Sequence, residues 1–310
     1  MTFSYNSEKL NKDRLDSYLA ERLTDMSRSR IQSLIKSGDV TVNGAKTKAG
    51  YILTYGDTID VNIPEPEVID ICAEDIPLDV VYEDDDVIVI NKPKDMVVHP
   101  ANGHYSGTLV NALMHHCKDS LSGINGEMRP GIVHRIDKDT TGLIIACKND
   151  KAHNCIAAQL AEHSITRRYI ALVYNNFNVD EGTVDANIDR SKADRKMMAV
   201  CPPYEGRTAV THYKVLDRFP AHAQYKIPMT LVECKLDTGR THQIRVHRSH
   251  IGHPLAGDDT YGIKKDMFAG KGQYLHAAVL GFTHPSTGER MEFSAPLPDY
   301  FEETLKKLKS

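Results

Sequence analysis

The sequence lacks the paired cysteines of a disulfide framework or of a C-x-x-C metal site. Its six cysteines are scattered along 310 residues. A chain of this length suits two domains or one large one, and its core does not depend on cross-links. Isolated cysteines in such a chain are typical of reduced thiols in a cytosolic protein, so we expect a cytoplasmic location.

Long apolar runs are also missing. No run approaches the length of a membrane-spanning helix. The first residues, Met1 to Tyr5, lack the charged stretch and the apolar core of a signal peptide. We therefore expect neither a membrane anchor nor export.

The chain has no overall basic excess, which many proteins that bind nucleic acid carry. Its net charge is −4, with 26% charged residues. Residues 65–88 hold ten acidic residues and no Lys or Arg, residues 1–64 carry a net +1, and residues 89–310 carry a net +5. One acidic segment thus conceals a mildly basic remainder, and net charge neither favours nor excludes an RNA partner.

Metal and cofactor motifs are scarce. There is no H-E-x-x-H and no G-x-G-x-x-G loop. His115, His116 and Cys117 are contiguous, so their side chains diverge, and no carboxylate stands at a typical ligand offset from the histidines between 242 and 253. We expect no metal and no cofactor.

What is present begins with a small module over residues 12–64. Apolar residues at helical spacing predict a first helix near 15–23. Ser27 can cap a second helix and Gly38 can end it. A strand near 39–42, a tight turn at Asn43-Gly44 and a strand near 58–63 follow.

The second helix begins with basic residues, Arg28 and Arg30, and carries Lys36 further on. Helix N-termini and arginines both favour phosphate, although a solvated basic helix end is the alternative interpretation. The run from Arg14-Leu15-Asp16 through Gly38-Asp39-Val40 to Gly56-Asp57 resembles the S4 RNA-binding domain. This resemblance implies RNA binding by the three basic residues.

We predict three parts: an S4-like domain over 1–64, an acidic linker over 65–78 that opens with Pro64-Glu65-Pro66-Glu67, and a larger domain over 79–310. Many strands with few long helices predict an α+β fold with a mixed or antiparallel sheet for the larger domain. The predicted strands are 80–82, 87–90, 143–147, 168–173, 210–216 and 229–236, and one helix is predicted over 151–163.

The segment from His134 to Leu143 holds the strongest chemical signal. Asp137 stands between Arg135 and Lys138, and an ion pair would favour its ionised form, ready to act as nucleophile or base. Asp139 is an equal rival on spacing alone. The alternative is a charged surface turn.

Two further clusters accompany this segment. Thr238 to His247 contains Arg240 and Arg245, either of which can pair with a carboxylate or hold phosphate. Arg167-Arg168-Tyr169 heads a strand, where Tyr169 can stack on a nucleobase or pack in the core.

Together these clusters resemble the RluA family of RNA pseudouridine synthases, and with the S4 module the chain is similar to its RluD-like branch. The landmarks are His134–Asp137, Thr140–Leu143, Asn91-Lys92-Pro93, Arg168-Tyr169, Thr238–Arg245 and His253–Gly262.

The resemblance implies a cofactor-free isomerisation of uridine, and it implies four roles. Asp137 corresponds to the catalytic aspartate, and Arg135 to the arginine that fills the space of the everted base. Tyr169 corresponds to the tyrosine that stacks on uracil and assists proton removal at C5. Arg245 corresponds to the partner of the aspartate, with Arg240 as second choice and as an RNA contact. Arg248 stands where methionine is common.

We expect a monomer that acts on large-subunit (23S) ribosomal RNA. The alternatives are the same chemistry on transfer RNA, a non-catalytic RNA-binding or ribosome-assembly protein, and a hydrolytic N-glycosidase.

Overall fold

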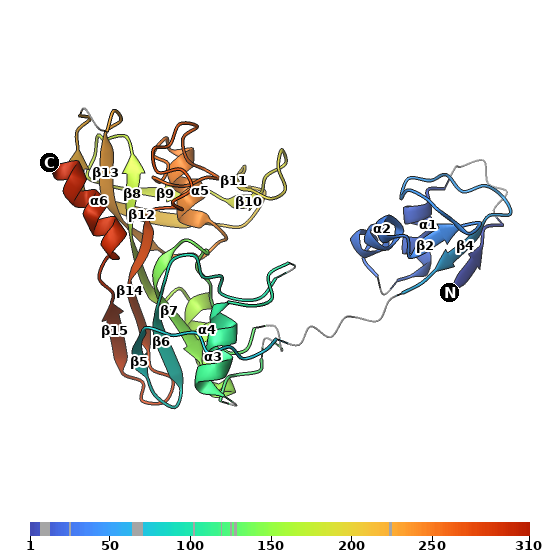
Figure 1. Cartoon of the computed structure of the whole chain (residues 1–310), viewed down its shortest axis with the longest axis horizontal. Coiled ribbons are helices and arrows are strands. Elements are labelled where there is room, and N and C mark those ends of the chain that lie inside the picture. Colours follow the sequence, from blue (N-terminus) through green and yellow to red (C-terminus); the bar gives the residue numbers. More distant parts are fainter. Residues whose placement is uncertain are drawn as a thin grey trace. The chain divides into compact units, whose positions relative to one another are not determined.

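The computed structural model describes the chain except for residues 7–12, 25, 64–70, 102, 119, 125, 127, 128, 223 and 224. The chain divides into two compact units, residues 1–69 and residues 70–310, which are described separately (Figure 1). Among the described residues, no helix is long and apolar enough to cross a membrane.

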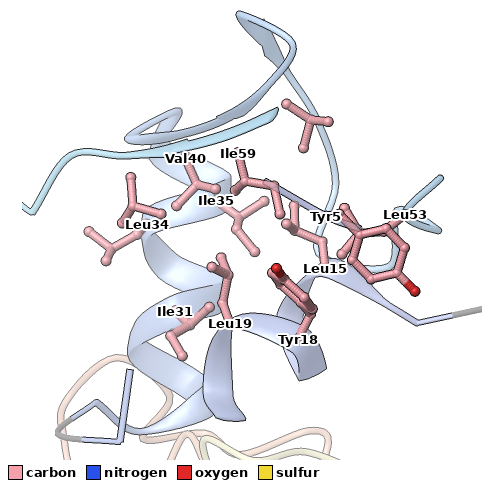
Figure 2. Packing of buried hydrophobic residues seen from close by; sticks show 12 residues of the cluster. Tyr5, Leu15, Tyr18, Leu19, Ile31, Leu34, Ile35, Val40, Leu53 and Ile59 are labelled. Atoms are coloured by element: carbon pink, nitrogen blue, oxygen red, sulfur yellow. The ribbon is translucent and has the colours of Figure 1, made fainter. Parts of the chain in front are cut away.

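The first unit packs two helices on a small sheet. Strands β1, β4, β2 and β3 pair in that order, every neighbour antiparallel. Figure 2 shows how side chains from both helices point into one apolar core with those of the strands. The bounds are β1 Thr2–Ser4, α1 Leu15–Arg22, α2 Arg28–Ser37, β2 Val40–Val42, β3 Ala45–Lys46 and β4 Thr58–Val61.

The predicted ends of α2 are confirmed. The Ser27 hydroxyl accepts a hydrogen bond from the backbone N–H of Arg30 at 3.3 Å, and Gly38 adopts a left-handed conformation with φ 92°. The predicted turn at Asn43 and Gly44 has positive φ at both residues, as a two-residue hairpin turn requires. Local sequence signals therefore determine the local geometry of this unit.

A buried carboxylate, that of Asp16, joins α1 to α2. Its side chain is fully buried and accepts hydrogen bonds from Arg14, Arg28 and Gln32 at 2.7 to 3.3 Å. Burial alone would raise the pKa of Asp16, but these donors outweigh it and lower the pKa well below the usual range. Arg28, Arg30 and Lys36, all predicted as RNA contacts, are exposed, but Arg28 also pairs with Asp16 and is thus part of the fold of this unit.

The second unit is built on a nine-stranded mixed sheet. Its strands are ordered β5-β6-β7-β14-β8-β13-β12-β9, with β15 paired to β14 and one parallel pair, β7 with β14. The strand bounds are β5 Val80–Glu83, β6 Val87–Lys92, β7 Thr141–Cys147, β8 Thr166–Tyr174, β9 Glu181–Asp185, β12 Val210–Phe219, β13 Met229–Leu236, β14 Leu275–Thr283 and β15 Arg290–Ser294. The predicted α+β class with a mixed sheet is confirmed.

Helices and a short hairpin complete this unit. One core cluster joins α4 to β6, β7 and β14, and another joins α6 to β8 and β13, so α6 lies along the sheet (Figure 1). The bounds are α3 Leu109–Cys117, α4 Asp150–Ala161, α5 Gln243–His250, α6 Asp299–Lys309, β10 Ile188–Arg190 and β11 Met198–Val200.

The predicted linker over 65–78 does not coincide with the boundary between the two units, which lies between residues 69 and 70. Residues 64–70 lie outside the described residues, but residues 71–78 belong to the second unit. Ile71 is buried, the Glu74 backbone N–H donates to the Asn111 carbonyl, and the Glu74 carboxylate accepts from the Gly107 N–H. These contacts, made with residues far along the chain, hold a segment whose acidic composition suggested a spacer.

Arg248 on α5 is an unusual core residue. It is fully buried, and all three guanidinium nitrogens are without a hydrogen-bond partner in the described part of the chain. Its Cζ lies 4.5 Å from the ring centroid of Tyr213 and 5.9 Å from that of Phe177. Burial lowers the pKa of Arg248, so the charge is held there at a cost that two aromatic contacts offset only in part.

We therefore expect Arg248→Met to stabilise the second unit by about 1–4 kcal/mol, because an apolar side chain of similar length removes an uncompensated buried charge. Urea denaturation of the full chain measures this change. Arg218→Met, at a half-exposed arginine paired with Asp180, is the control and should change stability by less than about 1 kcal/mol. A loss of stability in the Arg248 variant would show that the aromatic contacts outweigh the burial cost.

Candidate active site

The central strands bring three distant segments into one row. Gly142 on β7 lies beside Ala277 on β14, and Ala277 lies beside Tyr169 on β8. Gly142 has φ 102°, and a Cβ there would stand 2.3 Å from the Ala277 carbonyl oxygen, so only glycine fits. The loop that precedes β7, which contains Asp137, therefore ends close to Tyr169.

Buried polar contacts hold this loop. The His134 Nε2 accepts a hydrogen bond from the Ile145 N–H at 3.1 Å, and burial, followed by the charge of Arg167, lowers the pKa of His134 to about 3. The neutral ring is what this acceptor role needs. At the end of the loop, the Thr140 hydroxyl accepts from the Gln273 side chain at 3.1 Å.

Lys92 binds the backbone of this loop through its ammonium group. Its side chain is fully buried, and its ammonium donates to the carbonyls of Pro93, Met96 and Lys138 at 2.7, 2.9 and 2.9 Å. Burial lowers the pKa of Lys92 to about 7, opposed by neighbouring carboxylates. The bond to the Lys138 carbonyl is made one residue after Asp137, so Lys92 constrains the backbone that carries this aspartate.

Asp137 pairs with Arg245. The Arg245 Nη1 lies 2.9 Å from Asp137 Oδ2, while Nε and Nη2 of the same guanidinium bind Asp258 at 2.7 and 2.8 Å. Asp258 also accepts the backbone N–H groups of Thr260 and Tyr261 at 3.0 Å each. Burial would lower the pKa of Arg245, but the two carboxylates outweigh it and raise that pKa. Asp258 thus fixes the orientation of the guanidinium that pairs with Asp137.

His242 approaches the other oxygen of the same carboxylate. Its Nε2 lies 3.7 Å from Asp137 Oδ1, and its Nδ1 lies 2.9 Å from the Tyr261 hydroxyl. The residue stands just before α5 with φ 55°, a left-handed conformation that is uncommon for histidine. Burial lowers the pKa of His242, which favours the neutral ring. Sequence analysis had considered this histidine only as a metal ligand.

The start of α5 is held by Gln243, a residue that sequence analysis did not single out. Its side-chain oxygen accepts from the Arg240 N–H and the Thr238 hydroxyl, and its amide donates to the Val210 carbonyl and the Thr211 hydroxyl. All four distances are 2.8 to 3.0 Å, and the side chain is buried. The signal available in the sequence was only a glutamine two residues before Arg245.

These segments enclose a cavity of about 550 Å³ that contains both Asp137 and Tyr169. Asp137 is the one acidic residue of its lining among the described residues, against six arginines: Arg129, Arg135, Arg167, Arg207, Arg240 and Arg245. A chain of net charge −4 therefore has a strongly cationic cavity.

The structure brings together most of the predicted residues. Asp137, Tyr169, Arg245, Arg135 and Arg240 all line this cavity. Tyr169 is largely buried, which raises the pKa of its phenol. Arg135 is exposed and lies 3.5 Å from the His99 ring nitrogen, Nη1 to Nε2. Arg240, the second-choice partner of Asp137, instead donates from Nε to the Thr208 carbonyl at 3.0 Å.

The sequence neighbours of Asp137 are not its ion partners. Lys138 pairs with Asp95 at 2.8 Å, away from the cavity. The partners of Asp137 in the described part of the chain are Arg245 and, when protonated, His242. Asp139 is not among the residues that line the cavity.

A sheet-based domain with one arginine-paired aspartate in a cationic cavity is suited to an enzyme with an anionic substrate. Comparison with known proteins narrows the class. Residues 86–250 match the model of the RNA pseudouridylate synthase family, and residues 13–59 match the S4 domain. The chain belongs to the RNA pseudouridine synthases, enzymes that isomerise uridine to pseudouridine, and it carries an S4 RNA-binding domain.

The relatives match over nearly their whole length. An uncharacterized RNA pseudouridine synthase of Bacillus subtilis, YlyB, is 53% identical over 98% of this chain and 96% of its own. Ribosomal large subunit pseudouridine synthase D of Zymomonas mobilis is 45% identical over 95% of this chain and 93% of its own. The solved structure of human RNA pseudouridylate synthase domain containing 1 shares the fold, with a TM-score of 0.57 at 23% identity over 80% of this chain and 98% of that one.

The support that Lys92 gives to the loop should depend on pH. Between about pH 7 and its ordinary pKa of about 10.4, the unfolded chain holds a proton that the folded one has lost. The stability of the wild type relative to Lys92→Met should therefore rise with pH across this window, by up to about 1.4 kcal/mol per unit.

Denaturation of both proteins at a series of pH values measures this difference. Lys138→Met, at an exposed lysine on the same loop, is the control and should show no such rise. A difference between wild type and Lys92→Met that stays constant with pH would contradict the assignment.

Proposed function

We propose that Asp137 is the catalytic group of this pseudouridine synthase and that the substrate is a uridine of large-subunit ribosomal RNA. The observation that carries the first part is the fork of Arg245, which binds Asp258 on one side and Asp137 on the other inside the cavity. The second part rests on relatives named ribosomal large subunit pseudouridine synthase D, at 42–45% identity.

The reaction breaks the N1–C1′ bond, turns the uracil and joins C5 to C1′. Asp137 begins it either by attacking C1′ or by removing the C2′ proton, and both routes need an ionised carboxylate. Arg245 occupies Oδ2, so Oδ1 is the oxygen that reacts. Pairing with a guanidinium that is itself held by Asp258 fixes the orientation of the Asp137 carboxylate.

Tyr169 and Arg135 handle the base. Because burial raises the pKa of the Tyr169 phenol, the ring is neutral at rest, which suits stacking on the uracil. Any help at C5 then requires that the phenol lose its proton during the reaction. Arg135, exposed at the cavity, fills the space that the everted uridine leaves in the RNA and offsets part of the unstacking cost of a few kcal/mol.

RNA phosphates meet exposed cations in both units. Arg129 and Arg207 are exposed residues of the cavity lining, and Arg30 and Lys36 are exposed on α2. Two tethered modules raise the overall affinity for one RNA. We propose that the protein acts as a monomer in the cytoplasm, on the large-subunit ribosomal RNA that the names of its relatives indicate.

The first test is Asp137→Asn, which keeps the shape of the side chain and removes its charge. We expect turnover to fall by at least about 10⁴-fold while RNA affinity stays nearly unchanged, because the phosphate contacts remain. Tritium release from C5-labelled uridine in large-subunit ribosomal RNA measures the loss. Asp139→Asn is the matched control two residues away and should retain most of the turnover.

Three outcomes would contradict this proposal. Full turnover by the Asp137 variant would exclude the assigned role. Free uracil without tritium release from C5 would indicate an N-glycosidase, and no reaction by the wild type would indicate a binding protein. Pseudouridine mapping in cells with and without the gene tests the substrate: a change in transfer RNA alone would replace ribosomal RNA with the alternative.

The S4 contacts can be separated from the S4 fold. Arg30→Ala and Lys36→Ala should each weaken RNA binding and reduce the slope of log affinity against log salt by about one, with thermal stability unchanged. Arg28→Ala should lower the stability of the first unit, because the buried Asp16 carboxylate loses one of its donors. Binding titrations at several salt concentrations and thermal unfolding distinguish the two effects, and an unchanged slope for Arg30→Ala and Lys36→Ala would contradict the phosphate contacts.

A further inference from the structure

Arg167 is a buried cation in the cavity, and no carboxylate among the described residues forms an ion pair with it. It lies on β8 two residues before Tyr169, so both side chains leave the same face of the strand. Only 7% of Arg167 is exposed, and it lines the cavity together with Asp137 and Tyr169. In the described part of the chain its Nη2 has one acceptor, the Asp237 carbonyl at 3.4 Å, and its Nε has none.

The fold makes room for this guanidinium. Arg168 pairs with Lys235 in the sheet, which places Arg167 beside the end of β13, where Gly239 follows. A Cβ at Gly239 would stand 2.5 Å from Arg167 Nη1, so the guanidinium lies directly against the backbone of the Thr-Gly-Arg segment. The positive charge of Arg167 also acts on a neighbouring group, because it adds to the effect of burial in lowering the pKa of His134.

Burying a charge without a partner is costly, and a site that keeps one is suited to a negative charge that arrives with the substrate or forms during the reaction. The other arginines of the cavity have different tasks. Arg245 donates hydrogen bonds to Asp258 and Asp137, and Arg240 donates one to the Thr208 carbonyl. Arg129, Arg135 and Arg207 are exposed, where RNA phosphates can reach them.

The reaction creates such a charge. When the N1–C1′ bond breaks, its electron pair stays with the uracil and spreads from N1 onto the ring carbonyl oxygens. Asp137 becomes neutral in the same step, either as an ester at C1′ or by taking the C2′ proton. One negative charge thus passes from the aspartate to the departing base, whichever route is followed.

We propose that Arg167 is a further catalytic residue, which donates to a carbonyl oxygen of the uracil stacked on Tyr169 and stabilises the uracil anion as it departs. The proposal rests on the function proposed above for Asp137 and Tyr169. A base drawn out of the RNA reaches a buried donor beside the stacking ring, whereas a backbone phosphate stays with the exposed arginines. The donor acts where charge develops in the transition state, and it requires no rearrangement at that moment.

The test compares two RNAs that differ in the leaving group. One carries uridine at the target position and the other 5-fluorouridine, whose electron-withdrawing fluorine stabilises the uracil anion without help. Wild type, Arg167→Gln and Arg167→Lys are studied in single-turnover reactions with enzyme in excess. Since fluorine cannot leave as a cation, conversion of both RNAs is followed by nuclease digestion and chromatography.

We expect Arg167→Gln to lower the rate of conversion of uridine by about 10²–10³-fold with little change in RNA affinity. The loss should be at least several-fold smaller with 5-fluorouridine, and Arg167→Lys should be intermediate. Arg168→Gln is the matched control, because the Arg168 guanidinium lies on the neighbouring register position and pairs with Glu292. It should convert both RNAs at the wild-type rate.

Equal losses on the two RNAs would overturn the proposal. So would a loss confined to affinity with a smaller salt slope, which would make Arg167 a phosphate contact. Thermal unfolding and RNA binding of each variant identify a folding defect. If Arg167→Gln has such a defect, the ratio of the conversion rates of Arg167→Lys on the two RNAs tests the proposal instead. Failure of the wild type itself to convert uridine would instead contradict the proposed function.

Discussion

The pairing of one guanidinium with two carboxylates is the interaction on which the rest of the site depends. Arg245 is buried, and burying a cation is costly unless its donors are satisfied. Asp258 satisfies two of them and is itself held by two backbone N–H groups, so the fork points in a fixed direction. Asp137 then meets a positive charge that was positioned by other parts of the fold. The orientation of the Asp137 carboxylate is a consequence of this contact.

The distribution of charge matters more than its sum. Net charge alone neither favoured nor excluded an RNA partner, yet one acidic residue and six arginines line the cavity among the described residues. A cavity walled by protein concentrates the field of such residues, while the acidic segment near residues 65–88 lies elsewhere in the sequence. The overall composition averages the charges of the cavity and of the acidic segment. It therefore conceals the positive charge of the cavity that an anionic substrate would meet.

Local signals in the sequence were sufficient where the structure is local. The cap at Ser27, the end of α2 at Gly38 and the bounds of β13 followed from neighbouring residues. The central strand β14 was missed, because both of its faces are largely buried and its pattern does not alternate. Asp137 could be chosen over Asp139 only by family resemblance, since Arg245 is 108 residues away. Arg167 and Gln243 were missed for the same reason: their importance comes from Gly239, Thr211 and Val210, which the fold brings to them.

The arginines of the cavity divide by depth, and this division bears on what the catalytic domain can recognise. The buried ones, Arg245 and Arg167, line the cavity with Asp137 and Tyr169, where under the proposed function every uridine presents the same atoms. The exposed ones are proposed to contact the sugar–phosphate backbone, which is also common to all RNA. Neither set distinguishes one uridine from another by its sequence. Selection of the target must therefore depend on the shape of the RNA that fits around the cavity and on the affinity that the S4 domain adds, which is why the chemistry follows from these residues more directly than the target does.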